Sequence, residues 1–245
     1  MNFAIEDSPE QSAFRVEVRA FLDKAVSPKI EHMADPCDMS FEQYQLRRDL
    51  GRALGERGWL YPSMPKEYGG GDLSAEKVAI LHDELTRIGL ALPPYYDAGG
   101  RMGAPTILVW GTDEHKKRFL PPICKGLVRT WQLLTEPGAG SDLAGIKTTA
   151  IRDGDHYVLN GTKIYITNGP VADVLLVYAK TRPGPGSGGI SAFVVEKDFP
   201  GFKVAQKLVK MGFRGSQTGE LVFDNCRVPA ENLVGGENNG VAVVM

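Results

Sequence analysis

The chain has 245 residues, of which 42% are hydrophobic and 24% are charged, as is typical of a globular protein with one large domain or two ordinary ones. With 28 basic and 30 acidic residues its formal net charge is -2, which disfavours nucleic acid as a partner. The 3 cysteines form no C-x-x-C pair, and the 4 histidines lack metal-ligand spacing. We therefore expect neither a disulfide framework nor a metal site.

The first residues of the chain, MNFAIEDSPE, are acidic and contain no basic region followed by an apolar run. We therefore expect no signal or transit peptide. Further along, no apolar stretch is long enough to span a membrane. Together with the sparse cysteines, this pattern predicts a cytoplasmic protein without a membrane span.

The first half of the chain has apolar residues at helical spacing, which we interpret as core packing. Ser8 and Gln11 fit a capping box that begins a helix, and Pro28 predicts the end of that helix. Residues 40–43 repeat the capping-box pattern and predict a second helix, which closes at Gly58.

Three more helices are predicted before the pattern changes. A loop rich in Pro and Gly, Trp59–Asp72, leads to the third helix, for which Ser74 can serve as the N-cap. The other two are predicted at roughly Gly103–Trp110 and at Asp113–Cys124. Thr112 can cap the last one, and acidic residues in its first turn suit the positive end of the helix dipole.

From about Arg129 the pattern changes to strands. Asn160-Gly161 is typical of a two-residue turn and predicts a hairpin formed by Asp155–Leu159 and Thr162–Thr167. Further strands are predicted at Val174–Lys180, Ile190–Glu196 and Glu220–Phe223. Helices followed by consecutive strands favour an α+β chain, with a helical domain joined to a β-domain.

The predicted domains are a helical domain over residues 1–128, a β-domain over residues 129–238 and the start of another helix over residues 239–245. Gly240–Met245 is apolar and ends without a helix-stop signal. We therefore interpret the chain as cut rather than finished.

Two glycine-rich stretches are interpreted as connections. Residues 184–189 match the letters of the dinucleotide fingerprint G-x-G-x-x-G, but a strand follows where the fingerprint needs a helix. A flexible hairpin loop is the better interpretation. Gly69-Gly70-Gly71 lacks the lysine and serine arrangement of a phosphate-binding loop and predicts a turn.

Two other segments carry side chains that suit a ligand. In Leu134–Asp142 the glycines leave backbone amides open to close approach, and Thr135 and Ser141 add hydroxyls. In the second strand of the predicted hairpin, alternation places Tyr165 and Thr167 on one face, where they could stack on a flat heterocycle and bond to it. An ordinary polar turn and a cross-strand aromatic remain the alternative interpretations.

Five segments, in order along nearly the whole chain, resemble the acyl-CoA dehydrogenase family. Leu134–Asp142 resembles the signature T-E-P-G-A-G-S-D, and Lys163–Gly169 resembles K-x-W-I-T-N-G. The other three segments are Pro65–Gly70, Gly111–Arg118 and Val228–Gly235. The family pattern has Trp where this chain has Tyr165, and a small residue where it has Leu133, so we expect stacking to survive and the pocket shape to differ.

The resemblance implies a helical N-terminal domain, an antiparallel β-barrel or sandwich domain, and a C-terminal four-helix bundle that this chain lacks. It implies FAD as the cofactor and α,β-dehydrogenation of an acyl-CoA thioester to a 2-enoyl-CoA. It also implies an electron-transfer flavoprotein as the electron acceptor and a homo-oligomer, a dimer or tetramer, at full length. The family's base is a glutamate of the C-terminal domain, so we assign no catalytic residue here and expect this chain alone to be inactive.

The resemblance assigns the following residues to FAD: Gln132, Leu134, Thr135, Ser141, Tyr165 and Thr167. Tyr165 is expected to stack on the flavin ring, Thr167 to bond near its reactive nitrogen and Thr135 near its pyrimidine edge. Ser141 is also expected to face the substrate.

The substrate and the exact reaction are left open by the sequence. Tyr95, Tyr96 and Met102 are expected near the acyl pocket by position, and two tyrosines there favour a shaped or ring-bearing acyl group. An acyl-CoA oxidase or a flavin monooxygenase relative is the alternative within the superfamily. From a different class, the chain could be a non-catalytic subunit of a mixed oligomer.

Overall fold

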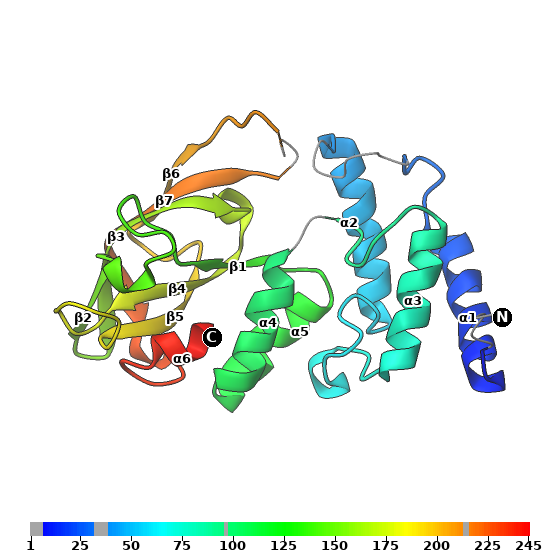
Figure 1. Cartoon of the computed structure of the whole chain (residues 1–245), viewed down its shortest axis with the longest axis horizontal. Helices are drawn as coiled ribbons and strands as arrows, with labels where there is room; N and C mark the ends of the chain where they lie inside the picture. The colour runs from blue at the N-terminus through cyan, green and yellow to red at the C-terminus, as the bar shows by residue number, and fades with distance from the viewer. Residues whose placement is uncertain (1–6, 32–38, 96–97, 213–215) are drawn as a thin grey trace, which may run out of the picture. The chain divides into compact units, whose positions relative to one another are not determined.

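The computed structural model of the chain, shown in Figure 1, describes residues 7–31, 39–95, 98–212 and 216–245. The chain forms two compact units. The first, the helical unit, is Met1–Tyr96 with Cys124–Gly126, and the second, the sheet unit, is Asp97–Ile123 with Leu127–Met245. Among the described residues, no helix combines the length and the apolar character that crossing a membrane requires.

The helical unit is built from helices that begin at local capping residues. Its helices are α1 (Pro9–Ala25), α2 (Phe41–Glu56), the short 3-10 helix η2 (Lys66–Tyr68) and α3 (Ala75–Arg87). The predicted capping box at Ser8 is confirmed, because Ser8 and Gln11 each accept a hydrogen bond from the other's backbone amide. Ser74 caps α3 by accepting from the amide of Lys77, as predicted.

The capping box predicted for α2 is only half formed. Ser40 Oγ accepts from the amide of Gln43 at 3.2 Å, but the Gln43 side chain does not return to Ser40. Instead, Gln43 accepts from the amide of Glu31 at 3.0 Å and donates to the carbonyl of Lys29 at 2.8 Å. Because Gln43 is buried, its amide satisfies backbone groups of the preceding segment rather than the helix end.

A buried carboxylate joins α1 to α3. Glu84 of α3 accepts from Arg15 at 3.0 Å and from Arg19 at 2.7 Å, both in α1, and from Arg87 at 2.9 Å. Its side chain is only 2% exposed. Three guanidinium groups therefore compensate one buried charge, which fixes how the two helices pack.

Over its described residues, the sheet unit combines helices with a sheet of eight strands. Its helices are α4 (Ala98–Trp110), α5 (Asp113–Cys124), α6 (Gly240–Val244) and the 3-10 helices η3 (Leu143–Gly145), η4 (Gly169–Val171) and η5 (Ala230–Asn232). Its strands are β1 (Thr130–Leu133), β2 (Thr149–Asp153), β3 (His156–Thr167), β4 (Val174–Lys180), β5 (Ile190–Glu196), β6 (Phe202–Lys207), β7 (Thr218–Pro229) and β8 (Leu233–Val234). The predictions missed β2, β6 and β8 and began α4 too late.

The strand order is β6-β7-β3-β2-β4-β5-β8, and β1 pairs with β4 off this path. Most neighbours are antiparallel, but β1 pairs with β4 in parallel, and so does β2 at Thr149. Over the described residues, β6 and β8 end the order without pairing to each other. A helical part followed by a sheet is therefore confirmed. Of the two forms predicted for the β-domain, an antiparallel barrel or a sandwich, the barrel is not confirmed, because the sheet is not closed over the described residues.

The hairpin predicted at Asn160-Gly161 is wrong. β3 runs through both residues, with an irregularity in its pairing to β7 between Leu159 and Gly161. The turn lies earlier, between β2 and β3, where Asp153 pairs with His156. Glycine is needed at 161 for a different reason: its φ is 152°, and a Cβ there would lie 2.4 Å from Thr148 Oγ1.

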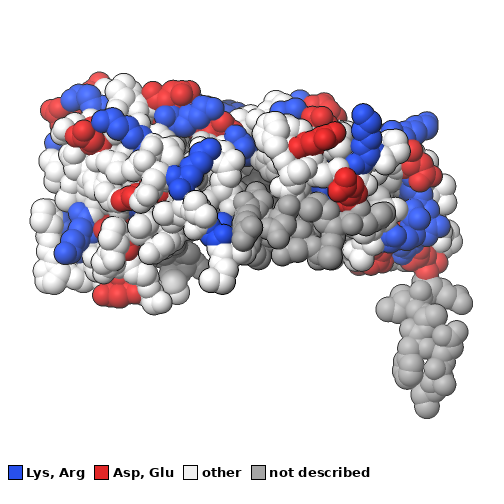
Figure 2. All heavy atoms as spheres, turned by 90° about the horizontal axis from the view of Figure 1, so that it is seen from above, with Lys and Arg blue, Asp and Glu red and all other residues white. Residues whose placement is uncertain are grey.

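The predicted domain limits, 1–128, 129–238 and 239–245, stay a prediction. The compact units divide near residue 96 instead, because α4 packs on β1. Gln132 Nε2 donates to Thr106 Oγ1 at 3.0 Å, and a Cβ at Gly103 would lie 2.8 Å from Thr130 Oγ1. On the face shown in Figure 2, basic and acidic side chains are interspersed.

Candidate functional site

The signature loop, which we define as residues 134–148, leaves the sheet between β1 and β2. Both strands pair with the same side of β4, β1 along Val174–Val177 and β2 at Lys180, so the intervening chain must project from the sheet. Within the loop, the backbones of Glu136 and Ala139 exchange two hydrogen bonds of 2.9 and 3.1 Å. This tight turn presents Pro137 and the first loop glycine to the outside.

A bulge in β3 faces the signature loop. The pairing of β3 with β7 shifts between Lys163 and Ile166, and Tyr165 has a φ of 58°. The bulge interrupts the regular alternation predicted for this strand, but Ile166 is buried between the exposed Tyr165 and the half-buried Thr167. That Tyr165 and Thr167 share one face stays a prediction. Tyr165 is 66% exposed, and the amide of Ile164 donates to the carbonyl of Thr135 at 3.0 Å.

A buried ion pair connects the loop to the bulge. Lys163 Nζ lies 2.8 Å from Glu136 Oε1 and donates to the carbonyl of Leu134 at 3.1 Å. The Lys163 side chain is 0% exposed and that of Glu136 is 6% exposed. Burial opposes ionisation of Glu136, but the attraction of Lys163 and the hydrogen bonds outweigh it, so the pKa of this carboxyl lies below its usual value.

Nothing in the local sequence predicts this ion pair. Both residues belong to the motifs that predicted the site, yet a charged residue in a loop or strand is ordinarily assigned to the surface. Only the pairing of two distant segments shows that the lysine of one motif meets the glutamate of the other.

The structure brings together four of the six residues predicted to meet FAD. Leu134 and Thr135 start the signature loop beside Tyr165, and Thr167 ends the bulged strand. Asn168 then takes a left-handed φ of 55° and terminates β3. Among the described residues, the half-buried hydroxyls of Thr135 and Thr167 form no hydrogen bond with the chain, which leaves them free for a ligand.

The other two predicted FAD residues lie at the margins of this group. Ser141 is exposed within the signature loop. Gln132 lies in β1, but its side-chain amide donates to Thr106 of α4. Gln132 therefore contributes to the attachment of α4, and its role toward FAD stays a prediction.

Two of the residues predicted near the acyl group, Tyr95 and Met102, belong to different units, so their meeting at one pocket stays a prediction. Met102 is 41% exposed on α4, in the sheet unit. Tyr95 belongs to the helical unit, where it is 3% exposed and meets Tyr44 edge-on at 6.1 Å between ring centroids. Tyr96 lies outside the described residues.

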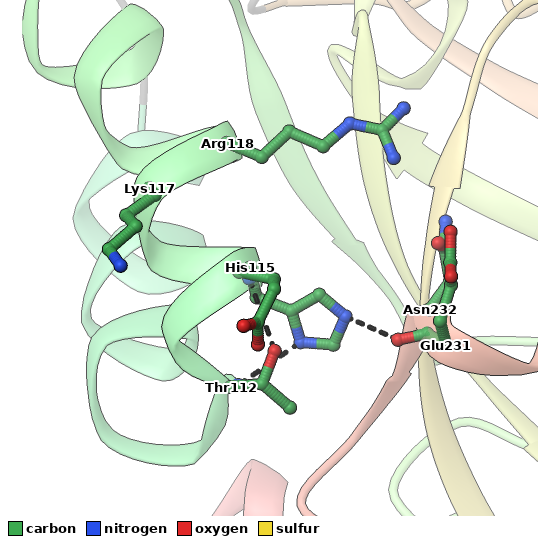
Figure 3. A pocket seen from close by; sticks show the side chains of 7 residues that line it. Thr112, His115, Lys117, Arg118, Glu231 and Asn232 are labelled. Atoms are coloured by element: carbon green, nitrogen blue, oxygen red, sulfur yellow. Dashed lines mark hydrogen bonds between the residues drawn. The ribbon is translucent and has the colours of Figure 1, made fainter.

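A cavity of about 750 Å³ lies between α5 and η5, and none of the residues predicted for the site is among those that line it (Figure 3). It is lined by Thr112, Glu114, His115, Lys117, Arg118, Glu231 and Asn232. His115 bridges its two sides: its Nδ1 accepts from the amide of Thr112 at 3.3 Å, and its Nε2 lies 2.6 Å from the carbonyl of Glu231.

Both nitrogens of His115 are therefore occupied by backbone partners, which requires the neutral ring with its proton on Nε2. Burial lowers the pKa of His115, in agreement with this neutral form. Thr112 caps α5 by accepting from the amide of His115, as predicted. We assign the histidine to attachment of α5 rather than to acid–base chemistry.

Two family models match the chain: the acyl-CoA dehydrogenase N-terminal domain over residues 8–127 and the middle domain over residues 132–226. The chain is 40% identical over 240 residues to mitochondrial isovaleryl-CoA dehydrogenase of Pongo abelii, covering 97% of this chain and 56% of that protein. It is 45% identical over 201 residues to cyclohex-1-ene-1-carbonyl-CoA dehydrogenase of Geobacter metallireducens, covering 81% and 51%.

Among solved structures, the acyl-CoA dehydrogenase from Geobacillus kaustophilus matches with a TM-score of 0.76 at 37% identity, covering 99% of this chain and 62% of that one. The chain therefore belongs to the acyl-CoA dehydrogenase family. It spans 56% of the length of the Pongo abelii relative and 62% of the length of the Geobacillus kaustophilus one.

Proposed function

We propose that this chain is the flavin-facing part of an enzyme that dehydrogenates an acyl-CoA thioester between its α- and β-carbons, giving a 2-enoyl-CoA. One observation carries the proposal: the signature loop and the β3 bulge lie side by side, joined by the bond from the Ile164 amide to the Thr135 carbonyl. This contact puts an exposed aromatic ring and two free hydroxyls on adjacent segments.

The residues of this site fit FAD in three respects. Tyr165 offers an exposed ring for stacking. Thr135 and Thr167 offer hydroxyls that the chain does not use within its described part. A Cβ at Gly138 or Gly140 would meet nothing within 4 Å, so packing within the chain does not require glycine there and the bare backbone is left open to a ligand.

When bound, FAD would supply the acceptor for the hydride that leaves the β-carbon. The chain's own residues would hold it: Tyr165 against the ring, Thr167 near the reactive nitrogen and Thr135 at the pyrimidine edge. Ser141, exposed in the signature loop, would face the cofactor or the thioester-bearing arm.

Glu136 is not the base that removes the α-proton. Its two carboxylate oxygens are engaged by Lys163 and by the backbone amides of Lys147 and Thr148. A carboxylate held in this way has neither the access nor the raised pKa of a general base. We assign no base among the described residues, so the activity we propose is that of a longer protein containing this chain.

For the location, the oligomeric state and the electron acceptor, our proposal rests on the resemblance to the family. We propose a cytoplasmic homo-oligomer that passes electrons to an electron-transfer flavoprotein. For the substrate we propose a branched or ring-bearing acyl group, because the names of two similar relatives contain isovaleryl and cyclohex-1-ene-1-carbonyl. The buried position of Tyr95 adds no support to this choice.

Mixing the flavin-loaded protein with an acyl-CoA in the absence of oxygen tests the proposal. We expect a flavin-loaded protein that contains this chain at the family's full length to lose its flavin absorbance when a branched acyl-CoA is added. The 245-residue chain alone should show no turnover with an artificial electron acceptor, because no base is assigned within it. Full-length protein that binds no flavin, or whose flavin no acyl-CoA reduces, would contradict the proposal.

A further inference from the structure

The ion pair between Glu136 and Lys163 joins the two segments that carry the proposed flavin site. Its atoms lie 2.8 Å apart, and both side chains are almost completely buried. No other ion pair between described residues has both side chains as deeply buried as these two. The position of the pair between a loop and a bulge, rather than between two regular strands, needs an explanation.

The carboxylate of Glu136 holds both ends of the signature loop. Glu136 lies near the start of the loop, and its Oε2 accepts from the amide of Lys147 at 2.5 Å. Its Oε1 accepts from the amide of Thr148 at 3.0 Å, where the loop enters β2. One side chain thus closes the loop on itself.

The ammonium of Lys163 attaches the closed loop to β3. Lys163 Nζ also donates to the Leu134 carbonyl at 3.1 Å, directly before Thr135. The next residue, Ile164, donates its amide to the Thr135 carbonyl, and Tyr165 follows with its positive φ. The ion pair and this backbone bond together set the position of Thr135 relative to the Tyr165 ring.

Stability alone does not account for a pair of this kind. Removing two charges from water is costly, and a well-packed apolar pair of similar volume is often as stable or more stable. A charged pair with defined hydrogen bonds does, however, fix one geometry where an apolar pair would permit several.

We propose that Glu136 and Lys163 are positioning residues, which set the spacing between the flavin contacts of the signature loop and those of the β3 bulge. This inference rests on the proposed function, because it assumes that both segments contact FAD. Neither residue touches the cofactor in this proposal, and both act through Thr135 and Tyr165.

Two variants separate positioning from stability. Lys163→Met leaves the Glu136 carboxylate buried without its cation and should lower the melting temperature. The double variant E136Q/K163M carries no buried charge and keeps an amide oxygen as acceptor for the Thr148 amide, so we expect it to recover most of the lost melting temperature. Both variants should bind FAD about tenfold more weakly and lose the wild-type circular dichroism of the bound flavin.

The matched control is D153N/R227M. Asp153 and Arg227 form a 2.9 Å ion pair between β2 and β7. Unlike the buried pair, both side chains are at least half exposed, at 63% and 50%. This variant should keep the wild-type affinity for FAD and the wild-type flavin spectrum. Wild-type affinity and spectrum in E136Q/K163M would overturn the inference.

A second measurement keeps the inference testable without flavin. In the flavin-free protein, the Ile164 amide should exchange with deuterium about tenfold faster in E136Q/K163M than in the wild type, because its acceptor in the loop has lost its attachment. An unchanged exchange rate would overturn the positioning role. Failure of the wild type to bind FAD would instead count against the proposed function.

Discussion

Tyr165 combines two features that a residue with a purely structural role rarely shares. Its φ of 58° is costly for a bulky side chain, by about 1–3 kcal/mol, and its 66% exposure means that the ring gains little from packing within the chain. The surrounding bulge must therefore hold it in place. We infer that the bulge is retained for the position of the ring, as expected where a ligand stacks.

Tyr165→Gly separates the strain from the function. Glycine accepts the positive φ without cost, so the free energy of unfolding of the flavin-free chain should stay equal or rise by about 1 kcal/mol. FAD should bind about fivefold more weakly or worse, because the stacking contact is lost. Chemical denaturation and a fluorescence titration with FAD measure the two effects.

Tyr165→Trp is the control, since it keeps a ring and matches the family's residue; it should retain the affinity for FAD. If Tyr165→Gly destabilised the chain and left FAD affinity unchanged, the ring would have a structural role only.

At the scale of elements, the predictions succeeded where the determining contacts are local. The capping box of Ser8 and Gln11 depends on residues three apart, and its helix begins where predicted. Asn160-Gly161 has the local chemistry of a turn, but Gly161 is required by the approach of Thr148, which ends the signature loop. Local sequence could not show that the hairpin turn would form between Asp153 and His156 rather than at Asn160-Gly161.

The Glu84 cluster predicts a pH dependence for the packing of α1 on α3. Hydrogen bonds from Arg19, Arg15 and Arg87 outweigh burial and lower the pKa of Glu84 to about 2, from a usual value of 4.5. Because the folded-state pKa is depressed, the stabilisation is complete above pH 4.5 and is lost as the pH falls toward 2.

Comparing the wild type with the variant Glu84→Gln isolates the contribution of this carboxylate to the free energy of unfolding. The wild type should exceed the variant in free energy of unfolding by up to about 3 kcal/mol above pH 4.5, and the difference should shrink toward pH 2. Denaturant unfolding at a series of pH values measures it. A difference that does not vary with pH would show that the charge of Glu84 is not responsible.

At the scale of the whole molecule, five ordered motifs were enough to predict the family. They also predicted that a helical part precedes a sheet part along the chain. They did not predict the parallel pairing of β1 with β4 or the open sheet, because these depend on contacts between strands far apart in the chain. The flavin residues were predicted from two motifs, whereas the ion pair that joins those motifs became visible only in three dimensions.

The central claim is that FAD lies between the signature loop and the β3 bulge. Hydrogen–deuterium exchange of the protein with and without FAD tests it most directly, because exchange reports where a ligand protects the backbone. We predict slower exchange at residues 135–141 and 164–168, with the cavity between α5 and η5 unchanged. Slower exchange only around that cavity, or no slowing at either of the two segments, would contradict the account.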